Sequence, residues 1–119
     1  MDKIEKFEDL KVWQASKELA IFVYRIKCKT EYGLDVGYKD QIQRAAISIM
    51  SNIAEGYEYR NDKQFRRFLL ISKGSAGEVR SLLHIGKELG YISKEEYESM
   101  LSKALEISKM INGFIKVMK

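Results

Sequence analysis

The feature that most constrains this chain is a helical spacing of apolar residues that recurs along almost its whole length. Apolar side chains return every three or four residues in four stretches, at residues 9–29, 38–59, 62–89 and from 93 onward. As an α-helix, each stretch gains one apolar face, whereas a strand would alternate with a period of two. Proline breaks helices, and its absence from all 119 residues fits long helices joined by short loops.

Three turn signals separate the four stretches: two glycines within residues 30–37, the pair at 61–62, and Gly90. Asn61 with Gln64, and Ser93 with Glu96, have the spacing of capping boxes, which begin helices. Each predicted helix spans about 20 residues or more, or roughly 30 Å. Helices of similar length with short loops pack antiparallel. We therefore predict an all-α protein, an antiparallel up-down four-helix bundle, with residues 1–119 as a single domain without strands.

The residues that usually carry catalysis or bind metals are scarce. His84 is the only histidine and Cys28 the only cysteine, so a zinc site cannot be assembled. A Ser-His-Asp triad would have to use His84, and nothing near it in the sequence resembles a nucleophile elbow. Residues 74–77 are glycine-rich but lack the lysine of a phosphate-binding loop. We predict no enzyme, no catalytic residue, no metal and no cofactor. A single cysteine excludes an intrachain disulfide, which favours the reducing cytoplasm.

Positive charge gathers on the third predicted helix, although the formal net charge is only +4. Arg66, Lys73, Arg80 and Lys87 follow one another at intervals of seven residues, and Arg60, Lys63 and Arg67 form a second cluster near the helix start. One interpretation is a solvated row whose aliphatic stems cover apolar surface. The other is a track of phosphate contacts for nucleic acid, which we predict at these seven residues. Tyr57 and Tyr59 could stack on the bases of a single strand.

A polar stripe runs along the second predicted helix at three- or four-residue steps. The predicted polar network consists of Gln41, Arg44, Ser48, Asn52 and Glu55, together with Glu78 of the third helix. Either this stripe is the solvated side of the helix, or it forms a buried or interface network. The band of small residues at 72–77 includes two glycines, each costing about 1 kcal/mol in a helix. We favour a close helix crossing inside the bundle there over the approach of another molecule.

The helices carry more apolar surface than one bundle core can cover. In the second helix apolar residues occupy more than half the circumference, whereas packing on one core needs a stripe only ~100° wide. Exposed apolar area usually marks an interface. The predicted oligomer interface consists of Trp13, Phe22, Ile47, Met50, Met110 and Phe114. No apolar run approaches the ~20 residues that span a bilayer, so we predict no membrane contact.

Two motifs, NIAEG at 52–56 and GSAGE at 74–78, are supported by further matching segments at residues 7–13, 41–49, 65–69 and 89–92. With these features the sequence resembles the bacterial four-helix bundle proteins encoded within intervening sequences of 23S ribosomal RNA genes. The same family includes the accessory variability determinant of diversity-generating retroelements. The resemblance implies a ring-shaped homopentamer that associates with nucleic acid through basic residues. For the retroelement branch it also implies a reverse transcriptase as partner.

These observations lead to one predicted function and one alternative. The predicted function is a non-enzymatic homo-oligomer, pentameric according to the resemblance, that binds RNA or DNA through its basic surface residues. Such binding should depend strongly on salt and weakly on sequence, because only phosphate-type contacts are evident. The alternative is a protein–protein adaptor or scaffold without nucleic-acid binding, in which the basic row is merely solvated.

Overall fold

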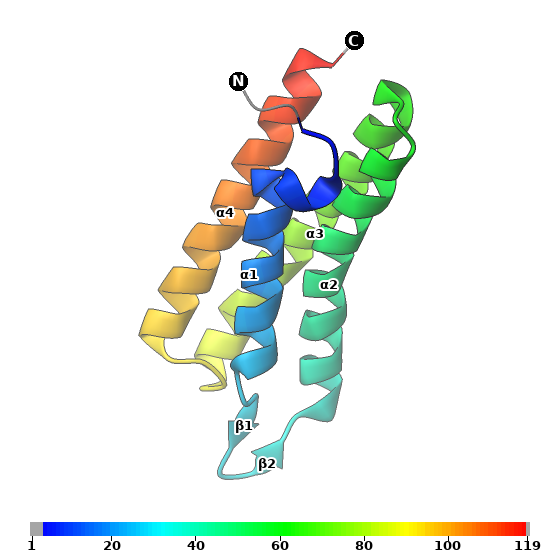
Figure 1. Cartoon of the computed structure of the whole chain (residues 1–119). Helices are drawn as coiled ribbons and strands as arrows, with labels where there is room; N and C mark the ends of the chain where they lie inside the picture. Colours follow the sequence, from blue (N-terminus) through cyan, green and yellow to red (C-terminus); the bar gives the residue numbers. More distant parts are fainter. Residues whose placement is uncertain (1–3, 119) are drawn as a thin grey trace.

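Four α-helices run antiparallel along the long axis of the molecule (Figure 1). The computed structural model describes residues 4–118. Its helices are α1 (Lys11–Arg25), α2 (Val36–Glu58), α3 (Asp62–Glu88) and α4 (Lys94–Val117), and a short 3₁₀ helix, η1 (Phe7–Asp9), precedes them. The predicted all-α bundle is therefore confirmed.

Each helix packs against two others. Within residues 4–118, α1 contacts α2 and α4, and α3 contacts the same two, but α1 and α3 do not meet. The helices thus form a square in cross-section, in which the α1–α2 side lies opposite the α3–α4 side. Every helix sends apolar side chains to the common core, for example Leu19, Ile49, Leu83 and Ile107, all fully buried.

The first helix is shorter than predicted, and a small hairpin follows it. Strands β1 (Lys29–Thr30) and β2 (Gly33–Leu34) pair antiparallel, so the prediction of a chain without strands was wrong here. Ile26 already has extended backbone, and Cys28 adopts a positive φ of 53°. Both side chains are nevertheless buried. The helix was predicted too long because these buried residues keep the helical spacing of apolar side chains beyond its end. The strands were missed because two residues are too few to show a period of two.

Side chains cap the three longer helices. The Asp35 carboxylate accepts a hydrogen bond from the backbone N–H of Tyr38 (3.0 Å), and Asn61 accepts one from Gln64 (3.1 Å). At α4 both halves of the predicted capping box form between Ser93 and Glu96. The box predicted at Asn61 is only half formed, because the Gln64 side-chain oxygen accepts instead from Arg67 Nε (3.2 Å).

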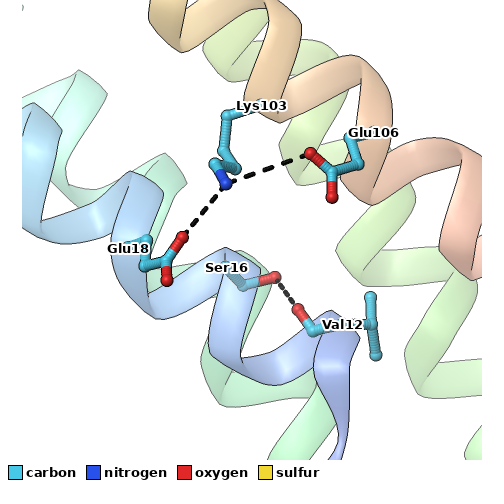
Figure 2. A network of polar contacts seen from close by, with 5 residues as sticks. All are labelled: Val12, Ser16, Glu18, Lys103 and Glu106. Carbon is cyan, nitrogen blue, oxygen red and sulfur yellow. Dashed lines mark hydrogen bonds and ion pairs between the residues drawn. The ribbon is translucent and has the colours of Figure 1, made fainter.

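An ion pair joins α1 to α4 on the side of the bundle that lies between them. Figure 2 shows Lys103 of α4 between Glu18 of α1, at 3.0 Å, and Glu106 of its own helix, at 3.9 Å. The hydrogen bond that the Lys103 ammonium group donates to the Glu18 carboxylate raises the pKa of Lys103, so the pair stays charged. Below it, the buried Ser16 hydroxyl donates to the Val12 carbonyl (2.7 Å), which satisfies a polar group inside the core.

Candidate nucleic-acid interface

The basic row of α3 lies along the seam with α4. The position of Lys87 shows this, because its ammonium group lies 4.7 Å from the ring centroid of Tyr97 on α4. Residues seven apart drift by only ~20° around a helix, so the whole row stays near this seam at about 10 Å per step. Arg66 and Lys73 are exposed, whereas Arg80 is half-buried and its Nε is covered by protein.

None of the seven predicted phosphate-binding cations forms an ion pair within residues 4–118. The ion pairs of this part of the chain involve Arg44 and Lys103 instead. Cations without a neighbouring carboxylate keep their full charge available to an anionic partner. The row therefore has the electrostatic character of a phosphate track, and it also fits the solvated row that the sequence left open.

Arg60 has a structural role that the sequence did not reveal. It adopts a positive φ of 53° in the turn after α2, and its guanidinium lies 4.7 Å from the Tyr57 ring centroid. It donates hydrogen bonds to the Tyr57 hydroxyl and to the Glu5 carbonyl. The Tyr57 hydroxyl in turn donates to the Ile4 carbonyl (3.0 Å). Arg60 and Tyr57 thus fasten the N-terminal segment to the end of α2.

The other residues of this cluster surround an aromatic pair. Tyr59 stacks on Phe68 with ring centroids 5.5 Å apart and an interplanar angle of 20°. The Arg67 guanidinium lies 4.7 Å from the centroid of the same Phe68 ring. Lys63 is exposed on the first turn of α3. The α2–α3 turn therefore brings together a tyrosine and several cations at one end of the basic row.

His84, set aside as lacking a catalytic partner, pairs with a tyrosine across the α3–α4 seam. Its Nδ1 lies 3.1 Å from the Tyr97 hydroxyl, and the two rings meet edge to face. Lys87 covers the same tyrosine ring. No local sequence pattern could predict this pair, because its members come from different helices. The contact orients His84 within the basic row and leaves it without the carboxylate of a triad.

The predicted polar network is partly assembled between α2 and α3. The Ser48 and Ser75 hydroxyls lie 2.7 Å apart, and Asn52 donates to Ser48 Oγ (3.0 Å). Farther along the seam, Gln41 donates weakly to Glu78 (3.4 Å). Arg44 is instead paired with Asp40 on its own helix at 3.0 Å in solvent, and Glu55 is exposed. The stripe thus divides into an α2–α3 seam and a solvated edge.

The close helix crossing predicted for the small-residue band of α3 forms at its serines, since the Ser72 hydroxyl donates to the Ile49 carbonyl of α2 (2.8 Å), but not at its glycines. A Cβ added at Gly74 or Gly77 would meet nothing within 4 Å beyond the helix's own backbone, so no other helix of this chain crosses closely there. The close approach occurs at Gly56 instead, where an added Cβ would lie 2.6 Å from Phe68 Cβ. The alternative, the approach of another molecule at Gly74 and Gly77, stays a prediction.

Five of the six predicted interface residues line two apolar hollows. One, of about 390 Å³ between α1 and α2, is lined by Trp13, Ile47 and Met50 among others. The other, of about 530 Å³ between α1 and the end of α4, is lined in part by Met110 and Phe114. Phe22 is exposed on α1 and lines neither. Both hollows open to solvent in this single chain.

Metal-ligating clusters and membrane-spanning helices are both absent from residues 4–118. Residues 4–118 contain no group of three metal-ligating side chains close enough to hold an ion. Across the same residues, no helix combines the length and apolar character that crossing a bilayer requires. Cys28 is fully buried, and burial raises the pKa of its thiol, which keeps it protonated and unreactive.

Comparison with known proteins agrees with this geometry. Residues 8–113 match the family described as 23S rRNA-intervening sequence protein. The fold is similar to a crystal structure from Bacteroides thetaiotaomicron VPI-5482, titled as a protein with unknown function from the S23 ribosomal protein family. The two chains share 28% sequence identity over 89% of this chain and 99% of the other, with a TM-score of 0.80. No curated protein matches. Neither description indicates an enzyme.

Proposed function

This chain belongs to the 23S rRNA-intervening sequence protein family, and from that premise we propose that it is a non-enzymatic nucleic-acid-binding protein. It binds RNA or DNA in the cytoplasm as a homopentamer, through phosphate contacts along α3. The residues that make these contacts are Lys63, Arg66, Arg67, Lys73, Arg80 and Lys87, whereas Arg60 is already engaged with the N-terminal segment.

The observation that carries the proposal is the row of cations on α3 without carboxylate partners. Three ion pairs form within residues 4–118, and all of them lie away from this row. Each phosphate that a cation neutralises releases counterions, and this release supplies most of the affinity of nonspecific nucleic-acid binding.

Assembly into a homo-oligomer is supported by the apolar surface that a single chain leaves open. The hollow lined by Trp13, Ile47 and Met50 lies on the side of the bundle opposite the basic row. Subunits that cover this side keep the cations facing outward, so that copies of the row add to one positive field. The resemblance to the retroelement accessory protein extends the proposal to a reverse transcriptase as partner.

The proposal is tested by reversing charge at two exposed positions. Arg66→Glu combined with Lys73→Glu should abolish gel shifts with RNA and DNA at low salt. In the parent protein the logarithm of the affinity should fall linearly with that of salt concentration. Converting only one of the two residues to Gln should lower the slope by roughly 0.7–0.9, the contribution of one phosphate contact.

Lys27→Glu serves as the control, because Lys27 is equally exposed but lies between α1 and the hairpin. This variant should bind as the parent does. If the Arg66 and Lys73 double variant retains nucleic acid undiminished, the row is only solvated and the protein–protein adaptor becomes the better description.

A further inference from the structure

We propose that Tyr59 is a stacking platform for an unpaired base, so that the basic surface takes single-stranded nucleic acid in preference to duplex. The inference rests on the proposed function and specifies the class of nucleic acid. The shared chemistry is an exposed base next to a phosphate, which single-stranded RNA and DNA both offer. In a duplex the bases are stacked on one another and cannot reach an aromatic side chain.

The ring of Tyr59 is both exposed and held in a fixed position. Tyr59 is 54% exposed, yet it is held in place, because its ring is stacked nearly parallel on Phe68. Phe68 itself is buried, so it occupies one face of Tyr59 and leaves the other toward solvent. A ring already fixed by packing loses little conformational entropy when a base binds, which is how preorganised sites gain affinity.

The residues of the α2–α3 turn and its flanks place Phe68 against the Tyr59 ring. Glycine at position 56 lets α3 approach α2 so closely that a Cβ there would clash with Phe68. The left-handed backbone of Arg60 then turns the chain sharply, and the Asn61 cap begins α3 at once. Phe68 is thereby brought under the Tyr59 ring. Tyr59 belongs to the most tightly constrained connection between the long helices.

Exposed charges near the Tyr59 ring differ in sign between α2 and α3. Arg67 contacts the same phenylalanine as Tyr59, and Lys63 and Arg66 are exposed on the adjoining turns of α3. On the α2 side, by contrast, Glu55 and Glu58 are exposed and would repel phosphates. A strand whose base lies on Tyr59 is therefore directed away from α2 and toward the cations of the first turns of α3.

Other aromatic residues do not offer such a platform. The ring of Tyr57 is covered by Arg60, and its hydroxyl is bonded to the Ile4 carbonyl. Tyr32 is 92% exposed at the hairpin tip, but no other aromatic ring of the described residues supports it. Of the two tyrosines that the sequence offered for stacking, only Tyr59 has a free face.

The test compares Tyr59→Leu and Tyr59→Trp with the parent protein. Short single-stranded RNA and DNA of one mixed sequence, and the blunt duplex of the same sequence, are titrated at low salt by fluorescence anisotropy. Tyr59→Leu should weaken binding of both single strands by roughly tenfold or more and leave the duplex affinity unchanged. Tyr59→Trp should restore single-strand binding. A 2-aminopurine base in the strand should be quenched by the parent and less by the leucine variant.

Tyr32→Leu is the matched control, since it removes an exposed tyrosine of the hairpin, at the opposite pole of the bundle from Tyr59, and thermal melting verifies that each variant is folded. Parent binding with no change in Tyr59→Leu would overturn the inference and leave the proposed function standing. Equal losses for single strands and duplex would also overturn it, because Tyr59 would then act only by holding the fold. If the parent binds neither form, the proposed function fails first.

Discussion

At the scale of single residues, Asp35 ties the start of α2 to the loop before α4. One oxygen of its carboxylate accepts from the backbone N–H of Tyr38 (3.0 Å), and the other accepts from the Tyr91 hydroxyl (2.7 Å). These two hydrogen bonds hold the pKa of Asp35 below its ordinary value of 3.8. The ionised form is therefore favoured by the folded state more than by the unfolded chain.

This shift predicts a specific dependence of stability on pH. Because the folded pKa of Asp35 is depressed, its contribution is fully present above pH 3.8 and is lost as the pH falls through the folded value. Asp35→Asn keeps a good capping residue but cannot titrate. Urea unfolding at a series of acidic pH values should show a shallower loss of stability for the variant. Parallel curves for variant and parent would contradict this account.

Single residues also mark the limit of what the sequence could reveal. Arg60 was predicted to contact phosphate because it is a cation near other cations. Its left-handed backbone and its bond to the Glu5 carbonyl depend on a turn and on a segment distant in sequence. Tyr59 and Tyr57 were both predicted from the sequence as candidates for base stacking. They differ only in their contacts in the folded chain, since Tyr59 stacks on Phe68 and the Tyr57 hydroxyl is bonded to the Ile4 carbonyl.

At the scale of elements, helical periodicity predicted the helices well and their ends less well. The third helix was expected at residues 62–89 and is found at Asp62–Glu88, because its cap and its glycine stop are local signals. The first was expected to reach residue 29 and ends at Arg25. Ile26 and Cys28 are buried although they lie beyond the helix. The apolar spacing therefore continues past the end of α1 and does not show where the helix stops.

The glycines of α3 could have been placed correctly from helical phase. Gly74 lies two residues before the buried Ala76, which puts it roughly 200° around the helix, away from the core. The composition of the segment suggested a close crossing, which its serines make with α2, whereas the phase of Gly74 turns this glycine away from the other helices. The polar network was divided for a similar reason, since Ser48 and Asn52 face α3 whereas Arg44 points outward.

Gly56 and Gly74 therefore form a matched pair of helical glycines with opposite predicted effects. Gly56→Ala should destabilise the protein by about 1–3 kcal/mol, because its methyl group would overlap Phe68. Gly74→Ala should stabilise the isolated chain by about 1 kcal/mol, because the helix gains propensity and nothing lies within 4 Å. Denaturant unfolding measures both changes.

Size-exclusion chromatography of the Gly74→Ala variant adds information that unfolding does not give. If another subunit packs closely on this face of α3, the variant should dissociate more readily while each chain is more stable. A loss of chain stability in Gly74→Ala would contradict the exposed position of this glycine.

At the scale of the whole molecule, the bundle has two unlike sides. The α1–α2 side carries the apolar hollow lined by Trp13, Ile47 and Met50. The opposite α3–α4 side carries the basic row, with Lys87 seated on Tyr97. An antiparallel square of helices separates these two surfaces across the core, as the proposed function requires if one side is to bind subunits and the other an anionic partner.

This separation predicts that assembly can be disrupted without unfolding the chain. Ile47 is 38% exposed at the hollow, so Ile47→Glu adds charge to a surface that we expect another subunit to cover. Light scattering should report a smaller species for this variant than for the parent. Leu34→Glu, at a 47% exposed leucine of the hairpin, should leave the mass unchanged. A parent that scatters as a monomer at micromolar concentrations would argue against assembly.

An even number of antiparallel helices returns the chain to the end from which it started. Ile4 accepts from Tyr57, and Phe114 of α4 lies 5.8 Å from Phe65 of α3, so the first and last described segments meet the α2–α3 turn at one pole (Figure 1). Affinity tags or fusion partners at either terminus would crowd that pole and could obstruct Tyr59. The hairpin at the far pole, with Tyr32 at its tip, is the better position for a fluorophore or an inserted epitope.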